Sequence, residues 1–576
     1  MNTKRGFQAA MLDRLMAHHF KLPAEVQTYT IDRTAQIPLR DEVKLLADVY
    51  HPSCANKSTP AGTLLVYGPY GRGLMTAYLA RCLAPRGYQV LVVCCRGTFG
   101  SGGEFDAQRS EVVDGQDIVS WMRRQSWYTG SFATIGASYL GYTQWALLVD
   151  PPEDMSTAVI LVGPHDFGDF HWSTGAFNGQ VIHWADIIAH QESSGLLGQT
   201  LRPLSSNRHL RIALNRLPLA DAVDEYFASE CSWLRQRLAN SDLKDPFWAP
   251  TKHGIALERA TIPILLITGW YDIFIEQTME QYRRLAERGC PVGLTVGPWT
   301  HDGVVVGPTM EEALNWLDEH LVKRGRGHRP NPVRVFITGT REWREIPEWP
   351  PATDPCDMYL LPQGGISRNP PTDFSESTFT FNPADPTPDI GSAPLSGLKG
   401  DVDDSRLAAR SDVLAYTSQP FENYTEILGR PQIEVAHTSD NPHVDLFVRV
   451  SEVDAKGHSH KVTEAYIRLD PEREAGPVRL DLHDCAHCFR EGTSLRVLIA
   501  GGSHPHYLRN LGTGEDPSTG TTLRPSQHTV HHGPVNASRL VLPIARESAA
   551  RLRTPTAVPI MDFVYAYSFN ASPSHE

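Results

Sequence analysis

The sequence predicts an α/β domain that is interrupted by a helical segment and followed by an all-β domain. Between Val43 and about Thr340, short apolar runs alternate with helical stretches, which is the pattern of a doubly wound sheet. Between about His165 and Ala260, aromatic residues cluster, and leucines and arginines then recur at helical spacing. After about Pro347 the chain is rich in Pro, Gly, Asp, Ser and Thr, and its apolar segments are short and alternating, as in a β-sandwich.

The strands of the α/β domain are predicted from apolar runs without polar alternation, because parallel strands are covered on both faces. These runs lie at 63–67, 88–94, 132–135, 158–162, 262–268 and 292–296. A chain of 576 residues is too long for one hydrophobic core. We therefore expect the first part of the core, with an N-terminal extension, over 1–164, and a helical lid insertion over 165–260. The second part of the core should cover 261–346, and a jelly-roll sandwich 347–576.

Composition excludes several classes of function. The net charge is −13, whereas nucleic-acid binding needs a basic face. The sequence contains no run of about 18 apolar residues and no secretory signal pattern, so we expect no membrane partner. The nine cysteines are odd in number and scattered, which favours a reducing, cytoplasmic location. Leu12, Leu15, Met16 and Phe20 predict a short amphipathic helix for packing or dimerisation, which leaves a homodimer open.

The strongest local motif surrounds Ser138. An apolar strand runs into Gly136-Ala-Ser-Tyr-Leu-Gly141 and is followed by a helix-compatible segment. A nucleophilic serine on a strained strand-to-helix turn needs small neighbours, and this turn places its hydroxyl at the end of the sheet. The second glycine comes one residue later than in the common Gly-x-Ser-x-Gly form, with Leu140 in its usual place. A tight turn without catalytic function is the alternative for this motif alone.

Two later strand ends favour catalysis. The run at 262–268 ends in Gly269-Trp-Tyr-Asp272, and the run at 292–296 ends in Gly297-Pro-Trp-Thr-His301. Active sites of open α/β sheets lie at the carboxyl ends of the strands. Ser138, Asp272 and His301 also follow the chain order of nucleophile, acid and base in α/β-hydrolases. Capping of a helix by Asp272 and packing of His301 under a loop are the structural alternatives. The joint occurrence of all three residues in this order favours a catalytic triad.

The sequence resembles the cocaine-esterase-like (CocE/NonD) acyl hydrolases, which are related to glutaryl acylases, α-amino acid ester hydrolases and X-prolyl dipeptidyl-peptidases. The motifs that carry the resemblance span nearly the whole chain, at 37–41, 67–71, 96–105, 136–141, 269–272, 297–301, 495–499 and 538–543. The resemblance implies an α/β-hydrolase core with a terminal jelly roll. It also implies that the backbone N–H of Tyr139 and the phenol of Tyr70 hold the oxyanion, although Tyr70 could simply pack under its loop.

Departures from this family bear on the substrate. Glu42 replaces a glycine of the usual Arg-Asp-Gly turn, far from the chemistry. The amino ester hydrolases place acidic residues near the active site to bind an ammonium group, whereas Ile273 and Phe274 follow Asp272 here. We therefore expect an apolar or aromatic acyl pocket, which argues against an α-amino acyl group. The predicted pocket walls are Trp172, Phe177 and Phe274.

The expected function is hydrolysis of a small-molecule acyl ester through an acyl-enzyme, without cofactor or metal. The run His483-Asp-Cys-Ala-His-Cys488 has metal-like spacing, but alternate strand faces cannot converge on one ion. An amidase or acylase, an X-prolyl dipeptidyl-peptidase or an acyltransferase could use the same triad. A non-catalytic binding protein with a vestigial triad is a further alternative.

Overall fold

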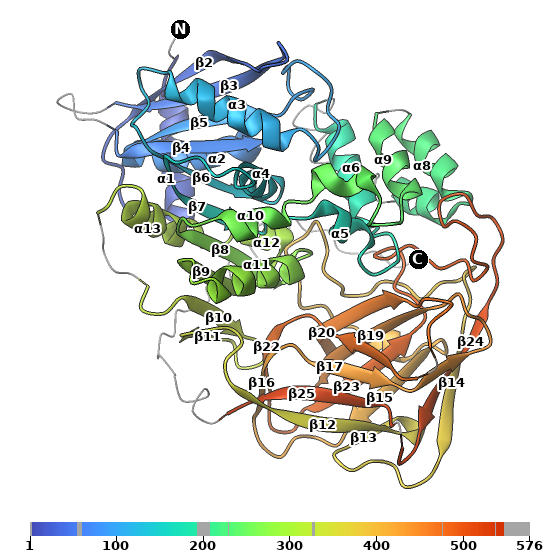
Figure 1. Cartoon of the computed structure of the whole chain (residues 1–576). Helices are drawn as coiled ribbons and strands as arrows, with labels where there is room; N and C mark the ends of the chain where they lie inside the picture. Colours follow the sequence, from blue (N-terminus) through green and yellow to red (C-terminus); the bar gives the residue numbers. More distant parts are fainter. Residues whose placement is uncertain are drawn as a thin grey trace.

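The computed structural model describes residues 3–53, 60–192, 208–228, 230–324, 329–474, 476–535 and 537–546. These residues form an α/β domain and a β domain, which lie one above the other in Figure 1. The predicted helical insertion also covers 193–207 and 229, which lie outside the described residues. The fold class predicted from the sequence, an α/β-hydrolase core with a helical insertion and a C-terminal all-β domain, is confirmed.

A sheet of eleven described strands runs through the α/β domain. Its order is β1 (Thr3–Lys4), β2 (Tyr29–Pro38), β3 (Lys44–Pro52), β5 (Tyr88–Cys94), β4 (Gly62–Gly68), β6 (Phe132–Ala137), β7 (Met155–Leu161), β8 (Ile264–Tyr271), β9 (Val292–Thr300), β10 (Val333–Ile337) and β11 (Glu342–Ile346). The strands from β5 to β10 are parallel. The carboxyl ends of β4, β6, β8 and β9 therefore lie along one edge of the sheet.

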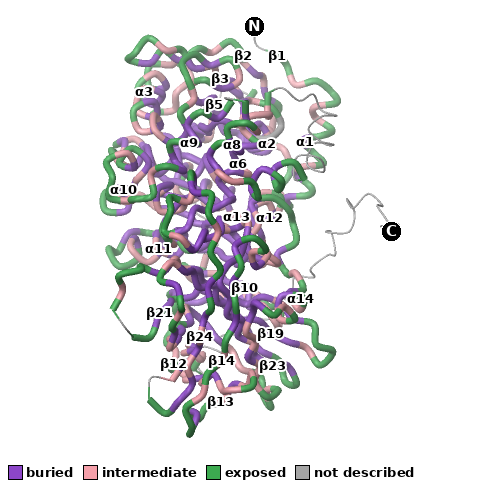
Figure 2. Tube along the Cα trace, turned by 90° about the vertical axis from the view of Figure 1, so that its right-hand side faces the viewer, coloured by how far each residue is buried: buried purple, intermediate pink, exposed green. Residues whose placement is uncertain are grey.

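Helices cover both faces of this sheet, which explains why its central strands are apolar throughout. All residues of β4, β5 and β8 are buried. One face packs against α3 (Glu111–Arg123), α4 (Tyr139–Leu147) and α11 (Ile275–Glu287). The other packs against α2 (Leu74–Leu83), α12 (His301–Val306) and α13 (Met310–His320). Figure 2 shows the buried segments running through the interior of the molecule, while α1 (Phe7–His19) lies at its margin.

The insertion supplies helices at the carboxyl edge of the sheet. These are α5 (Phe167–Trp172), α6 (Gln180–His190), α8 (Leu219–Phe227) and α9 (Ser232–Ala239), followed by the 3₁₀ helix η3 (Pro246–Thr251) and α10 (Gly254–Arg259). In Figure 1, α5 lies between the end of the α/β sheet and the β domain, and α6 lies above α5. Backbone bonds join the insertion to the β domain, since the N–H of Gly179 donates to His506 and that of Leu508 donates to Phe177.

The β domain begins after the first sheet ends. One sheet has the order β20-β19-β23-β15-β13-β12-β25-β16-β22, with β17 and β21 joined to it through β25, and a second has the order β14-β24-β18. The strands are β12 (Thr353–Leu361), β13 (Gly365–Ser367), β14 (Ser375–Phe381), β15 (Val413–Ser418), β16 (Thr425–Gly429), β17 (Gln432–Val435), β18 (His437–Ser439), β19 (Asp445–Val453), β20 (Ser459–Arg468), β21 (Val478–Asp481), β22 (Cys485–Phe489), β23 (Ser494–Ala500), β24 (Ser526–His532) and β25 (Arg539–Ala545). Their inward side chains form a separate core.

Three further observations concern features considered in the sequence. None of the described helices is both long enough and apolar enough to cross a membrane. The eight cysteines within the described ranges are free thiols. Across those same ranges, no three His, Cys, Asp or Glu side chains are grouped so that they could hold a metal ion.

Candidate active site

Ser138 occupies the turn between β6 and α4 in a strained conformation, with φ 60° and ψ −123°. A non-glycine residue in such a sparsely populated region costs of order 1–3 kcal/mol and persists only where its surroundings hold it. Here the N–H of Ser138 donates to Leu161 over 2.9 Å, and its carbonyl accepts from Gly141 and Tyr142. These bonds tie the turn to β7 and start the helix, so the serine lies at the edge of the sheet beside the helix N-terminus.

The glycines around Ser138 are required by close packing. A Cβ on Gly136 would lie 2.4 Å from the Cβ of Leu140, and a Cβ on Gly141 would lie 2.6 Å from the Cα of Gly163. Gly141 therefore lets α4 approach the end of β7. Leu140 occupies the position at which the second glycine of the motif is usually found, and it packs over Gly136. This packing explains why the second glycine comes one residue later, at Gly141.

Asp272 and His301 form a buried hydrogen-bonded pair next to this turn. Nδ1 of His301 lies 2.7 Å from Oδ1 of Asp272, and the two residues are 4% and 0% exposed. The hydroxyl of Thr268 donates to the other carboxylate oxygen of Asp272 over 3.0 Å. The pair forms because β8 and β9 are parallel neighbours, so residues just beyond their carboxyl ends lie side by side. The contact fixes the imidazole with Nδ1–H towards the carboxylate.

Phe274 links this pair to the serine. Its ring lies 5.4 Å from the ring of His301 at a steep angle, and it lines the same cavity as Ser138. The structure thus brings the serine, histidine and aspartate predicted from the sequence to one end of the sheet. Within the described residues, no direct hydrogen bond joins Ser138 to His301.

Tyr70 lies beyond the end of β4 and faces Ser138. Its hydroxyl accepts a hydrogen bond from Nε1 of Trp184 over 3.0 Å. Burial raises the pKa of Tyr70 to about 12, and hydrogen bonding with Trp184 and Ser138 opposes this shift only in part. The phenol therefore keeps its proton at neutral pH and can donate a hydrogen bond beside the serine.

Tyr139 contributes its backbone to the site and its side chain to the scaffold. As the first residue of α4, its N–H points out of the helix and is one of those that no helical carbonyl can satisfy. Its hydroxyl accepts from the N–H of Gln108 over 2.7 Å and donates to Glu111. Its ring stacks on Trp184, with centroids 5.7 Å apart and planes 14° apart. This backbone donor and the Tyr70 phenol thus flank Ser138.

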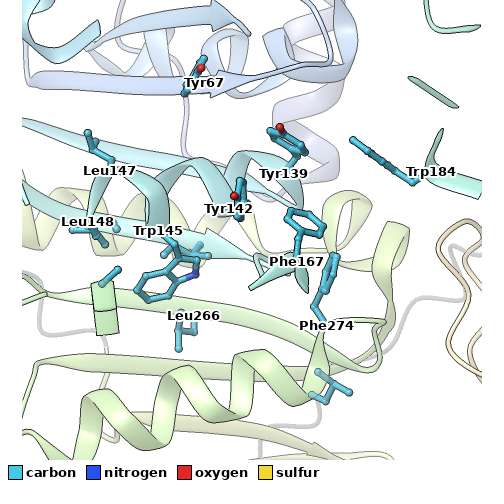
Figure 3. Packing of buried hydrophobic residues seen from close by; sticks show 14 of the residues in the cluster. Tyr67, Tyr139, Tyr142, Trp145, Leu147, Leu148, Phe167, Trp184, Leu266 and Phe274 are labelled. Carbon is cyan, nitrogen blue, oxygen red and sulfur yellow. The ribbon is translucent and has the colours of Figure 1, made fainter. Parts of the chain in front are cut away.

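An aromatic cavity lies beside Ser138. Figure 3 shows Phe167 next to Phe274, and Tyr139 facing Trp184. Six of its thirteen lining residues come from α5 and α6, and Leu395 comes from the β domain. The lining residues are Tyr70, Gln108, Ser138, Tyr139, Phe167, Phe170, His171, Gln180, Val181, Trp184, Ile273, Phe274 and Leu395.

Of the three predicted pocket walls, Phe274 lines the cavity, whereas Trp172 and Phe177 do not. On the short helix α5, positions 167, 170 and 171 share the face towards the cavity, and the next position points away. Trp172 accordingly donates to the carbonyl of Arg237 over 2.9 Å and packs on Phe177, with ring centroids 5.1 Å apart. Both residues lie behind the wall, and the prediction that they form the wall is corrected.

The sequence reasoning missed Phe167, Phe170, Trp184 and Leu395. The first three belong to the aromatic cluster at the start of the insertion, so helical periodicity could have separated them from Trp172. The sequence around Leu395 has no motif that points to the site, because Leu395 reaches the cavity only through packing of the two domains. Its N–H donates to Oε1 of Gln180 over 3.1 Å.

Two family models and one curated relative match most of this chain. Residues 41–303 match the X-Pro dipeptidyl-peptidase (S15 family) model, and residues 326–541 match the X-Pro dipeptidyl-peptidase C-terminal non-catalytic domain. The cocaine esterase of Rhodococcus sp. (strain MB1 Bresler) is 25% identical over 582 residues, covering 90% of this chain and 99% of that protein.

Solved structures show the same fold. An aminopeptidase from the marine sediment archaeon Thaumarchaeota archaeon and an α-amino acid ester hydrolase each superpose with a TM-score of 0.76 at 19% identity. Each comparison covers 91% of this chain and 98% of the other. With both domains matched and the cocaine esterase aligned along almost its whole length, the chain belongs to the X-Pro dipeptidyl-peptidase (S15) family and is a serine hydrolase of the cocaine-esterase-like type.

Proposed function

We propose that this protein is a carboxylesterase that cleaves a small acyl ester through an acyl-enzyme at Ser138. The observation that carries the proposal is the buried contact of 2.7 Å between His301 and Asp272, next to a serine held on a strained turn. Because the Nδ1 side of the imidazole faces the carboxylate, Nε2 is the atom left to accept the proton of the Ser138 hydroxyl.

The proposed reaction has two steps. The Ser138 oxygen attacks the ester carbonyl while His301 takes its proton, and His301 then gives that proton to the departing alcohol. Water, deprotonated by the same imidazole, hydrolyses the acyl-enzyme and returns the free hydroxyl. In both steps the oxyanion is held by the N–H of Tyr139 and the hydroxyl of Tyr70. The pKa of Tyr70, raised to about 12 chiefly by burial, supports its role as a neutral donor.

The cavity supports an aromatic or apolar acyl group as the substrate portion nearest the serine. Phe167, Phe170, Trp184 and Phe274 supply aromatic faces, and none of the residues that line this cavity is a carboxylate. An α-amino acyl group or a free peptide N-terminus would bring a cation that needs a buried counter-charge. The relation to a protein named as a cocaine esterase also supports an ester substrate. The proposed partner is therefore a small acyl ester.

Two assays test this function. A fluorophosphonate probe should label the wild-type protein, and Ser138→Ala should abolish labelling while the circular dichroism spectrum is retained. p-Nitrophenyl esters of aryl acids should then be hydrolysed with a burst of p-nitrophenol, as expected when an acyl-enzyme accumulates. Faster cleavage of the matched anilides would favour an amidase instead. Undiminished labelling of Ser138→Ala would contradict the assignment of the nucleophile.

A further inference from the structure

The wall of the aromatic cavity contains two buried polar atoms whose hydrogen-bonding capacity is unused. They are Nε2 of His171 and Oε1 of Gln108, and neither has a hydrogen-bond partner among the described residues. The two residues are 0% and 1% exposed, and both line the cavity beside Ser138. An unsatisfied buried polar atom costs about 1–3 kcal/mol, so two such atoms in the wall of one cavity indicate a ligand that supplies their partner.

The chemistry of His171 is fixed by its own helix. Nδ1 of its ring lies against the carbonyl oxygen of Phe167. A carbonyl can only accept, so Nδ1 carries the hydrogen and Nε2 presents a lone pair. Burial, together with the nearby Arg237 charge, lowers the pKa of His171 to about 3. The ring is therefore neutral at physiological pH, and Nε2 is an acceptor only.

Gln108 is held at the cavity by its backbone. The residue has a φ of 66°, in the left-handed region that side-chain-bearing residues rarely adopt. Its N–H donates to the hydroxyl of Tyr139 and its carbonyl accepts from that of Tyr142, both over 2.7 Å. Both tyrosines belong to α4, the helix that begins after Ser138. The amide oxygen of Gln108 is thus presented to the cavity by the same scaffold that holds the nucleophile.

We propose that the acyl pocket selects an aromatic acyl group that carries a neutral hydrogen-bond donor, namely a phenolic hydroxyl, and that His171 and Gln108 accept from it. The proposal rests on the esterase function proposed above. The aromatic part follows from the rings of Phe167, Phe170, Trp184 and Phe274, which face the cavity. The donor follows from two acceptors that share the wall. A charged ammonium is disfavoured because a neutral imidazole and an amide cannot replace its hydration.

The test uses the full-length enzyme and four p-nitrophenyl esters: the phenylacetate, the 4-hydroxyphenylacetate, the 3-hydroxyphenylacetate and the 4-methoxyphenylacetate. We expect kcat/KM for one hydroxy ester to exceed that for the phenylacetate by about tenfold, the worth of one to two neutral hydrogen bonds. His171→Phe and Gln108→Leu should each bring this ratio close to one. The methoxy ester adds bulk without a donor and should not be favoured.

A matched control is available in His253. This histidine is also buried, its Nε2 also has no hydrogen-bond partner among the described residues, and burial lowers its pKa to about 3. It does not line the cavity. His253→Phe should therefore leave the hydroxy-to-unsubstituted ratio at the wild-type value. Inhibition of the wild-type enzyme by 4-hydroxyphenylacetate and phenylacetate gives a second measure that needs no variant, and the hydroxy acid should bind more tightly.

The outcomes separate this inference from the proposed function. Equal kcat/KM for the hydroxy esters and the phenylacetate in the wild type would overturn the inference while leaving the esterase intact. An equally strong preference for the methoxy ester would also overturn the inference, because the enzyme would then select the acyl group by its size and not by its hydrogen-bond donor. If none of the esters is hydrolysed, the proposed function fails first, and the inference falls with it.

Discussion

The indole of Trp184 donates a hydrogen bond to the hydroxyl of Tyr70 while its ring stacks on Tyr139. One side chain of the insertion thereby orients the two residues that flank Ser138 from the core. Tyr70 lies beyond β4, Tyr139 begins α4 and Trp184 belongs to α6. The insertion therefore helps to position the residues around Ser138 and also forms part of the cavity wall.

Tyr70→Phe should lower kcat by about 100- to 1,000-fold with a smaller effect on KM. The phenol is proposed to donate to the oxyanion in the transition state, and the loss of one such donor costs about 2.7–4 kcal/mol. Steady-state kinetics with a p-nitrophenyl ester measures the effect. Trp184→Phe should cause a smaller decrease, because it removes only the hydrogen bond that positions the phenol.

The control for this substitution is Tyr67→Phe, on β4 just before the loop that carries Tyr70. Tyr67 is buried and does not line the cavity. Removal of its hydroxyl should leave kcat close to the wild-type value. If Tyr70→Phe were as active as Tyr67→Phe, the phenol would be a packing residue, and the oxyanion would depend on backbone donors alone.

Asp272→Asn should lower kcat by about four orders of magnitude while the fold is kept. The amide can donate to Nδ1, which stabilises the wrong imidazole tautomer and leaves Nε2 protonated. The rate of fluorophosphonate labelling should fall in parallel, because that reaction also needs the activated hydroxyl. Thr268→Val removes only the hydrogen bond to Oδ2 of Asp272 and should cost far less. Comparable losses in both variants would indicate a structural role for the carboxylate.

The positions of Ser138, Asp272 and His301 could be predicted because each follows an apolar strand that the sequence reveals. A strand end is a local feature, and parallel neighbours then bring distant ends together. The pocket could not be predicted in the same way. Composition identified an aromatic cluster, but the rotation of α5 decides that Phe170 faces the cavity and Trp172 faces away.

The contribution of the β domain was also beyond the sequence analysis. Gly397 accepts from the hydroxyl of Thr300 and donates to Asp302, and both partners are sequence neighbours of His301. No spacing or periodicity connects these segments, because the contact exists only once the two domains have packed. The loop that carries Gly397 also supplies Leu395 to the pocket.

Thr300→Val should reduce both stability and kcat. The Thr300 hydroxyl accepts from the N–H of Gly303 over 3.2 Å as the N-cap of α12, and donates to Gly397 over 2.5 Å. The loss of an N-cap costs about 0.5–2 kcal/mol, and α12 begins with His301, so the imidazole should be less well held. Thermal unfolding and kcat measure the two effects. Thr300→Ser keeps both hydrogen bonds and should stay near the wild type. Equal behaviour of the valine and serine variants would refute the proposed contact.

Glu111→Gln should make the stability of the protein less sensitive to rising pH. Burial raises the pKa of Glu111 from its ordinary 4.5 to about 7, although the hydrogen bond from Tyr139 opposes this. Below the ordinary pKa the carboxyl is protonated in both the folded and the unfolded chain, so it adds no pH dependence to the free energy of unfolding. As the pH rises, the unfolded chain loses this proton first, so the folded state is progressively disfavoured until it too ionises near pH 7. The variant should therefore gain about 2–3 kcal/mol in unfolding free energy relative to the wild type between pH 5 and pH 8.

Urea unfolding at several pH values measures this difference, and the slope with pH is the decisive quantity. A constant offset would reflect only the altered packing of the amide. Tyr142→Phe is the matched control, because its hydroxyl bonds to Gln108 in the same network and burial holds its pKa well above 10. Its effect on stability should be the same at every pH in this range. A flat difference for Glu111→Gln as well would mean that the carboxyl reaches water or a counter-charge. The hydrogen bond from Tyr139 to Glu111, which joins α4 to α3, would then not enclose a protonated carboxyl group.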